Sequence, residues 1–168
     1  MKSYEIFQRM SPDLAVEILG YLQKERTAIF KSVVSGLAGQ RNLRIVFVER
    51  KPPAERYAWI KTALSRKAGD TLAANSLQAW LLGAQKPMLC DFLDSLGINH
   101  DEDGTVEKLP ASPPKLELGA SIDRLLVKYP AETVAVYLHA FHDMDSTVSW
   151  PALGEVLAED ERLRLGSQ

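Results

Sequence analysis

The sequence lacks several features that would identify a class of protein. It has one cysteine, Cys90, so no disulfide can form within the chain, which fits a reducing compartment. Its apolar runs, such as residues 45–48 and 79–82, are far shorter than the roughly 20 residues of a membrane-spanning helix. The N-terminal sequence is charged and amphipathic, so we expect no signal peptide. These absences predict a cytoplasmic protein without a membrane partner.

Motifs for known chemistry are also absent. No serine sits in a nucleophile elbow, and no glycine-rich phosphate loop or Walker sequence is present. The formal net charge of −2 gives no overall attraction to nucleic acid or to an acidic membrane surface. The hydrophobic fraction of 46% and the charged fraction of 25% are those of an ordinary globular protein. We therefore expect no cofactor, and the sequence favours a protein that is not an enzyme.

The sequence does contain an apolar pattern that repeats with a constant offset. Its first copy is Tyr21, Leu22, Ile29, Phe30, Val33, Val34 and Leu37. The second copy, 59 residues later, is Trp80, Leu81, Met88, Leu89, Phe92, Leu93 and Leu96. A looser third copy is Tyr137, Leu138, Trp150, Leu153, Val156 and Leu157. Such repetition predicts stacked helical units that cannot bury their apolar faces alone.

The repeat suggests an organisation for the whole chain. We predict a single all-α domain over residues 1–168, with about eight helices as repeated hairpins and crossing helices, either α-solenoid-like or a compact bundle. The predicted repeats are 11–39, 70–98 and 130–161, and the connectors are 40–53 and 98–115. A helix break is predicted at residues 25–27, because the equivalent position in the second copy precedes Pro87. The apolar run 45–48 is predicted to be an extended segment against the helices.

An acidic turn at residues 99–107 resembles the start of a calcium-binding EF-hand loop. Asp101 and Asp103 lie at alternate positions before Gly104, as the oxygen ligands of that loop do. The resemblance then ends, because Pro110 stands where the loop has its bidentate glutamate. The alternative is a polar β-turn around Asp103 and Gly104 that closes a short hairpin.

Two histidines form a second candidate metal site. His139 and His142 are three residues apart on a predicted helix, so both side chains can face the same way. Asp143 and Asp145 follow, and histidines with carboxylates at this spacing can hold zinc or another transition metal. The sequence shows no second ligand cluster, however. The alternative is that His142 interacts with a helix C-terminus and that His139 lies at or near the surface.

Cys90 is a weak candidate for a nucleophile. A nucleophilic cysteine needs a nearby base and a positive environment that lowers the pKa of its thiol. Asp91 and Asp94 are close in sequence and should raise that pKa instead. We expect Cys90 to be a small, buried apolar residue.

The distribution of charge is the strongest indication of function. Residues 41–67 contain eight basic and two acidic residues, a net charge of +6. Residues 89–107 contain six acidic residues and no lysine or arginine, a net charge of −6. The two regions could meet, within one chain or across a dimer, or the basic residues could form a solvated helix face. The residues that we predict to bind a partner are Arg41, Arg44, Arg50, Lys51 and Arg56.

These observations favour an interaction or scaffold protein without catalytic activity. It would bind an anionic surface of a protein partner through the basic segment 41–67. The first alternative is a nucleic-acid-binding module that uses the same segment, with Phe47 or Tyr57 stacking on bases. The second alternative is a metal-dependent enzyme built around His139 and His142.

Overall fold

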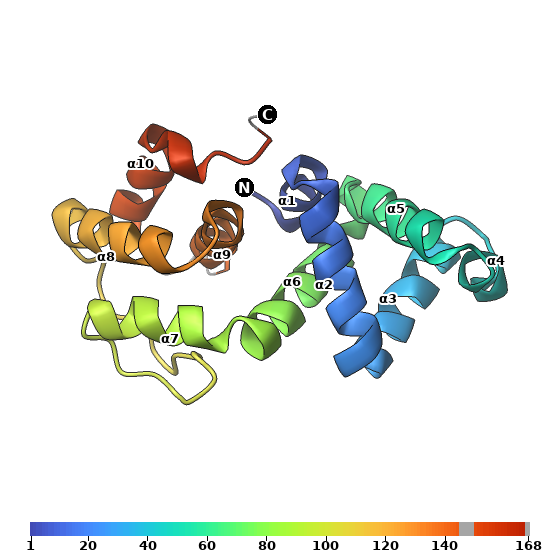
Figure 1. The fold of residues 1–168 in the computed structure, drawn as a ribbon, viewed down its shortest axis with the longest axis horizontal. Coiled ribbons are helices and arrows are strands. Elements are labelled where there is room, and N and C mark those ends of the chain that lie inside the picture. The colour runs from blue at the N-terminus through green and yellow to red at the C-terminus, as the bar shows by residue number, and fades with distance from the viewer. Residues whose placement is uncertain (145–149, 167–168) are drawn as a thin grey trace. The chain divides into compact units, whose positions relative to one another are not determined.

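The protein is all-helical in the part that the structure describes. The structure is a computed structural model, and it describes residues 1–144 and 150–166. These residues form ten α-helices and two short 3-10 helices, and they contain no β-strand (Figure 1). The all-α fold class is therefore confirmed, with slightly more helices than expected. Within the same residues, no helix combines the length and the apolar character needed to cross a membrane.

By its packing the chain divides into two compact units, Lys2–Trp80 and Leu81–Gln168. We call them the N-terminal unit and the C-terminal unit. Each has apolar side chains that are completely buried. The single domain over residues 1–168 stays a prediction.

The N-terminal unit is built around a helical hairpin. Its elements are α1 (Ser3–Arg9), α2 (Pro12–Glu25), α3 (Thr27–Gln40), α4 (Ile45–Glu49), α5 (Pro53–Leu64), η1 (Lys67–Gly69) and most of α6 (Asp70–Ala84). The start of α2 is capped by Ser11, whose Oγ accepts a hydrogen bond from the Leu14 N–H at 3.2 Å. Helix α2 packs on α3 and α5, and α1 packs on α5. The buried side chains of this core include Ile18, Leu19, Leu22, Leu37, Ile60 and Leu64.

The first helix break lies where the repeat predicts it. Helix α2 ends at Glu25 and α3 begins at Thr27, so only Arg26 separates them. Helices α6 and α7 (Lys86–Ser95) are separated by Gln85 alone, and Gln85 lies 59 residues after Arg26. The shared position of the break supports the alignment of the first two copies. That the copies have the same shape stays a prediction.

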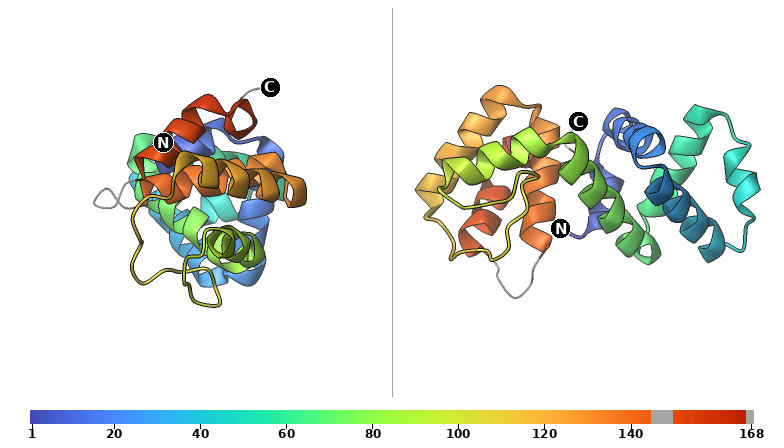
Figure 2. Two further views of the ribbon diagram at one scale, coloured as in Figure 1. Left: turned by 90° about the vertical axis from the view of Figure 1, so that its left-hand side faces the viewer. Right: turned by 90° about the horizontal axis from the view of Figure 1, so that it is seen from below.

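Helix α4 corrects the prediction for residues 45–48, which are helical and not extended. Val48 is completely buried, whereas the exposed fractions of Val46 and Phe47 are 44% and 54%. Successive side chains of a helix point about 100° apart, so four consecutive apolar residues cannot all face one core. The chain from 40 to 53 is therefore more than a connector. Figure 2 (right) shows α4 between the end of α3 and the start of α5.

The C-terminal unit continues with four α-helices. They are α7, α8 (Lys115–Lys128), α9 (Ala131–Asp143) and α10 (Pro151–Glu159), followed by η2 (Glu161–Leu163). Helix α8 packs against both α7 and α10, and it lies between them in Figure 1. Helix α9 packs against α8, α10 and η2. Residues 145–149, between α9 and α10, lie outside the described residues.

An aromatic cluster forms part of the core of this unit. The Phe92 ring on α7 makes T-shaped contacts with the rings of Tyr137 and Phe141 on α9. The ring centroids are 5.5 and 5.7 Å apart. Trp150 stacks at a tilt on Phe141, with centroids 5.0 Å apart. T-shaped contacts place the positive edge of one ring against the negative face of another. The cluster therefore holds α7 against α9.

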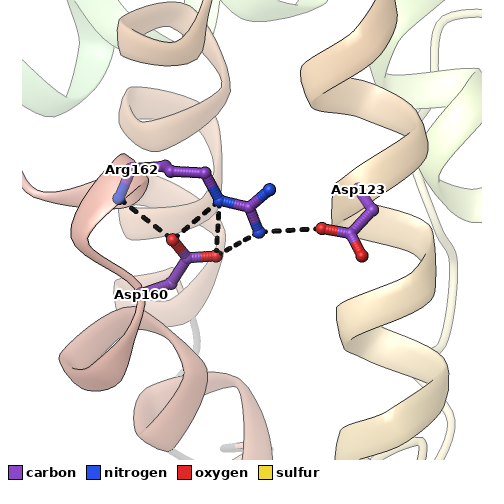
Figure 3. A network of polar contacts seen from close by, with 3 residues as sticks. All are labelled: Asp123, Asp160 and Arg162. Carbon is purple, nitrogen blue, oxygen red and sulfur yellow. Dashed lines mark hydrogen bonds and ion pairs between the residues drawn. The ribbon is translucent and has the colours of Figure 1, made fainter.

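A polar network fixes the C-terminal 3-10 helix η2 against α8 (Figure 3). Arg162 donates hydrogen bonds from Nε to Asp160 Oδ1 at 3.0 Å and from its terminal nitrogen to Asp160 Oδ2 at 2.7 Å. The same terminal nitrogen lies 2.7 Å from Asp123 Oδ1 on α8. These bonds from Arg162 lower the pKa of Asp160. Leu163 of η2 is completely buried, so apolar packing also holds η2 in place. The polar network fixes the orientation of η2.

The aromatic cluster gives the first prediction. Replacing the completely buried Phe92 by Ala removes its ring contacts and leaves a cavity. We expect Phe92→Ala to lower the free energy of unfolding by about 3–5 kcal/mol. Val127 is 91% exposed, so Val127→Ala should change it by less than about 0.5 kcal/mol. Urea unfolding followed by circular dichroism measures both, and equal small losses would contradict the assigned core.

Candidate partner-binding surface

The five basic residues predicted to bind a partner lie on neighbouring parts of the N-terminal unit. Arg41 follows α3, Arg44 precedes α4, Arg50 and Lys51 follow α4, and Arg56 is on α5. Arg44 and Arg50 are exposed, and the other three are half-buried. The structure therefore brings the five residues into one region but gives them different environments.

Arg56 has a structural role that the sequence did not reveal. Its terminal nitrogen donates hydrogen bonds to the carbonyl oxygens of Glu49 at 2.9 Å and Lys51 at 3.0 Å. These carbonyls are at and just beyond the C-terminus of α4, where a helix leaves acceptors without internal partners. A charged donor there also interacts favourably with the helix dipole. Arg56 thus caps the C-terminus of α4.

Arg41 is also held by its surroundings. Its guanidinium carbon lies 5.3 Å from the centre of the Trp59 ring, a cation–π distance. One of its terminal nitrogens is buried without a hydrogen-bond partner. The half-buried Arg41 is therefore less available to a partner than Arg44 or Arg50.

The remaining basic residues surround exposed apolar side chains on α4. We call Arg44, Val46, Phe47, Arg50 and Lys51 the α4 patch. The Lys51 Nζ lies 4.8 Å from the centre of the Phe47 ring. In the described part of the chain, no carboxylate forms an ion pair with the three basic residues of the patch. The patch thus combines unneutralised positive charge with exposed apolar surface.

Sequence reasoning missed Val46 as a surface residue and used Phe47 only in the nucleic-acid alternative. Four consecutive β-branched or aromatic residues are typical of a buried strand, which hid the helical register. A helix with only one completely buried position, Val48, must expose some of the others. The signal available in the sequence was Pro52-Pro53, which follows the run after three further residues, since a proline in the first turn starts a new helix, here α5.

The acidic segment differs from the basic one because its side chains have local partners. Asp91 Oδ2 on α7 accepts hydrogen bonds from Lys128 Nζ and Tyr129 Oη, each at 2.6 Å. These two bonds lower the pKa of Asp91. Asp94 pairs with His100 at 2.7 Å. Much of the negative charge in residues 89–107 is therefore paired with groups of the C-terminal unit.

The acidic turn has the hydrogen bonds of a β-turn. The Gly104 N–H donates to the Asp101 carbonyl at 3.0 Å, and Asp103 Oδ1 accepts from the Thr105 N–H and hydroxyl. Gly104 has a φ of +83°, and a Cβ there would lie 2.6 Å from the Leu89 Cβ. The predicted turn around Asp103 and Gly104 is present, without strands on either side in the described residues.

The two histidines of the candidate metal site have partners in neighbouring elements. His139 is buried, and its Nε2 lies 3.1 Å from the Leu163 carbonyl oxygen of η2. His142 packs on α10, where a Cβ at Gly154 would lie 2.9 Å from its Nε2. Asp143 ends α9, whereas Asp145 lies outside the described residues. Among the described residues, no three or more His, Cys, Asp or Glu side chains are grouped to hold a metal ion.

Cys90 is half-buried and not fully buried as predicted, whereas its thiol pKa is raised, as its acidic neighbours led us to expect. Burial is the largest cause, followed by the negative charges of Asp94, Asp91 and Asp103. Its Sγ lies 3.5 Å from the Glu102 carbonyl oxygen in the acidic turn. These surroundings oppose formation of the thiolate that nucleophilic chemistry requires.

The role of Arg56 gives the second prediction. Replacing it by Met keeps an apolar stem but leaves the Glu49 and Lys51 carbonyls without their charged donor. We expect Arg56→Met to lower the free energy of unfolding by about 1–3 kcal/mol. The exposed Arg44 makes no such bond, so Arg44→Met should change it by less than about 0.5 kcal/mol. Chemical unfolding compares the two, and equal effects would contradict the assigned role.

His100 gives the third prediction. Its hydrogen bonds to the Asp101 carbonyl and to Asp94 raise its pKa above the ordinary value of 6.5. The stabilisation from the protonated ring is therefore complete below about pH 6.5 and is lost as the pH rises through the higher pKa of the folded state. We expect His100→Asn to remove this part of the pH dependence. Urea unfolding at several pH values measures it, and an unchanged pH dependence would contradict the assignment.

Comparison with known proteins adds no family or function to this description. The chain matches no model of a protein family, no curated protein and no solved structure. The geometry and charge of the chain itself are therefore the indications of its function.

Proposed function

We propose that this protein works by binding, without catalysis, an acidic surface of a protein partner through the α4 patch. The observation that carries the proposal is the exposure of Phe47 beside Arg50 and Lys51, which have no acidic partner in the described residues. Arginine and aromatic residues are enriched at the centres of protein–protein interfaces. A surface that joins the two types is suited to a partner with carboxylates around an apolar group.

The charge and the apolar surface of the patch have different roles in this proposal. The positive side chains would speed up association and orient the partner, and their effect should weaken as salt rises. Phe47 would supply affinity, because full burial of such a side chain is worth about 1.5–3 kcal/mol and the 54% that is still exposed could contribute about half of that. Arg41 and Arg56 would contribute indirectly, by supporting the helices that carry the patch.

The apolar part of the patch favours a protein over a nucleic acid as the partner. Phosphate contacts need positive charge alone, and a nucleic-acid site usually lies in a broadly basic domain. The sequence pI is about 5.9, and Val46 adds an aliphatic surface that base stacking does not use. Binding to nucleic acid stays the competing outcome of the test.

The fourth prediction concerns the charge of the patch. A fluorescently labelled peptide rich in Glu and Leu should bind the protein, and the double variant Arg50→Glu with Lys51→Glu should bind it at least about tenfold more weakly. The matched control is Arg66→Glu with Lys67→Glu, which reverses two exposed charges in and beside η1. Fluorescence anisotropy measures the affinity, and thermal melting checks that each variant is folded.

Two further measurements test the role of Phe47 and distinguish a protein partner from a nucleic acid. Phe47→Ser should weaken peptide binding about tenfold without lowering the melting temperature, since its side chain is 54% exposed. A single-stranded RNA of similar charge should bind more weakly than the peptide. Tighter RNA binding, or equal peptide binding by the control and the α4-patch variants, would contradict the proposal.

A further inference from the structure

Helix α8 carries apolar side chains on two opposite faces. Its inner face is buried in the C-terminal unit through Leu118, Ile122 and Leu125. On the other side, Leu116 and Val127 are 87% and 91% exposed, the two highest values among the large apolar side chains of the described residues. They are 11 positions apart, close to three helical turns, so they lie on one line along the helix about 16 Å apart. The helix therefore has an apolar line that its own unit does not bury.

This apolar line lies between the two sides on which α8 meets its neighbours. Helix α8 lies between α7 and α10 in Figure 1, and it packs against both. Ion pairs join it to α7 through Lys128 and to α10 through Lys115. By helical spacing these two lysines project from different sides of α8, and the line lies between them. We call this side the outer face of α8, and its residues are Leu116, Glu117, Gly119, Ala120, Asp123, Arg124 and Val127.

The middle of the outer face contains two small residues. Ala120 is exposed, and a Cβ at Gly119 would lie in open space. Glycine inside a helix lowers its stability relative to alanine, and no contact with the described residues requires a glycine at this position. The distance between two packed helices depends on the side chains at their contact, so small residues let a second helix approach closely. The outer face is therefore suited to a helix as its partner.

Two charged residues at one edge of the outer face indicate which helix fits. Glu117 and Arg124 are seven positions apart, close to two turns, so they lie on the same edge. Neither forms an ion pair with another described residue. Two copies of α8 that pack antiparallel would place Glu117 of each copy beside Arg124 of the other. A parallel pair would instead place like charges together, so the edge favours the antiparallel arrangement.

One antiparallel register satisfies the apolar contacts and the ion pairs together. When Leu116 is level with position 126 of the second copy, Val127 of that copy is only one residue away, about 1.5 Å along the axis. In the same register Arg124 of the second copy is one residue from the level of Glu117. Because the pair is two-fold symmetric, each contact occurs twice. The outer face is therefore complementary to itself in shape and in charge.

The same register also accommodates the carboxylate on the outer face. Asp123 is level with Gly119 of the second copy, and the glycine leaves room for its side chain. Figure 3 shows Asp123 directed toward Arg162 of η2, and Arg162 lies 2.7 Å from Asp123 Oδ1. The negative charge therefore has a partner in its own chain and does not need one across the pair.

We propose that the outer face of α8 binds the same face of a second copy of this chain, with the two helices antiparallel. The helix has 14 residues and is about 21 Å long. A single helix pair of this length buries less than the roughly 1,200 Å² of a stable interface, so the dimer should be in exchange with the monomer, with a dissociation constant of about 0.1–1 mM. This surface is separate from the α4 patch and shares no residue with it.

Sedimentation equilibrium on the full chain tests the proposal. The average mass should rise above the 18.7 kDa of the monomer as the protein concentration increases from about 5 µM to about 1 mM. An average mass that stays at 18.7 kDa over this range would overturn the proposal. The monomer predominates at about 5 µM, so Val127→Ala keeps its small effect on unfolding at that concentration.

A pair of apolar-to-acidic variants locates the interface. Val127→Glu places a charge in the apolar line and should weaken self-association at least about tenfold. The matched control is Val46→Glu on α4, which changes another exposed valine and should leave self-association unchanged. Thermal melting checks that both variants are folded. Self-association that survives in folded Val127→Glu, or that is lost equally in folded Val46→Glu, would place the interface elsewhere and overturn the proposal.

A charge exchange tests the antiparallel register. Glu117→Arg and Arg124→Glu, made singly, each place like charges beside one another in the pair and should weaken self-association severalfold. The double variant restores opposite charges across the pair, so its self-association should return to that of the unaltered chain. A folded double variant that associates no better than the single variants would overturn the proposal.

Discussion

The hydrogen bonds from Arg56 to the end of α4 determine the candidate surface. A helix of five residues has too few internal hydrogen bonds to form alone. Ordering the backbone of the first turn costs more free energy than its hydrogen bond provides. Arg56 supplies a charged donor to two carbonyls that the helix leaves open. Burial of Val48 adds the apolar contribution. With α4 in place, Phe47 and Val46 face solvent beside unneutralised cations.

The sequence predicted the longer helices and their breaks because those depend on local chemistry. The first predicted repeat begins at residue 11, where Ser11 supplies a capping hydroxyl and Pro12 a fixed φ, and the break at Arg26 follows from comparison with the segment before Pro87. Helix α4 could not be predicted in this way. Its closing donor is seven residues away on another helix, and a run of Ile, Val and Phe has no helical preference of its own.

The candidate site likewise has features that follow from the sequence and features that depend on tertiary packing. The excess of basic residues at 41–67 is a property of composition and could be counted. Which of them face a partner depends on packing. Arg41 lies on Trp59 and Arg56 bonds to backbone, whereas Arg44 and Arg50 stay exposed. The acidic segment differs, because its carboxylates have partners in their own unit. Asp91 bonds to Lys128 and Tyr129, and Asp94 pairs with His100.

The contact between Gly104 and Leu89 has a consequence for the chemistry of Cys90. Because a Cβ at residue 104 would lie 2.6 Å from the Leu89 Cβ, the acidic turn lies directly against α7 at the level of the thiol. Burial is the largest cause of the raised pKa of the thiol, Asp94 and Asp91 of α7 come next, and Asp103 of the turn adds to them. Peroxides attack the thiolate and not the thiol. A raised thiol pKa leaves less thiolate for a peroxide to attack, so the packing of the turn against α7 lowers the reactivity of Cys90.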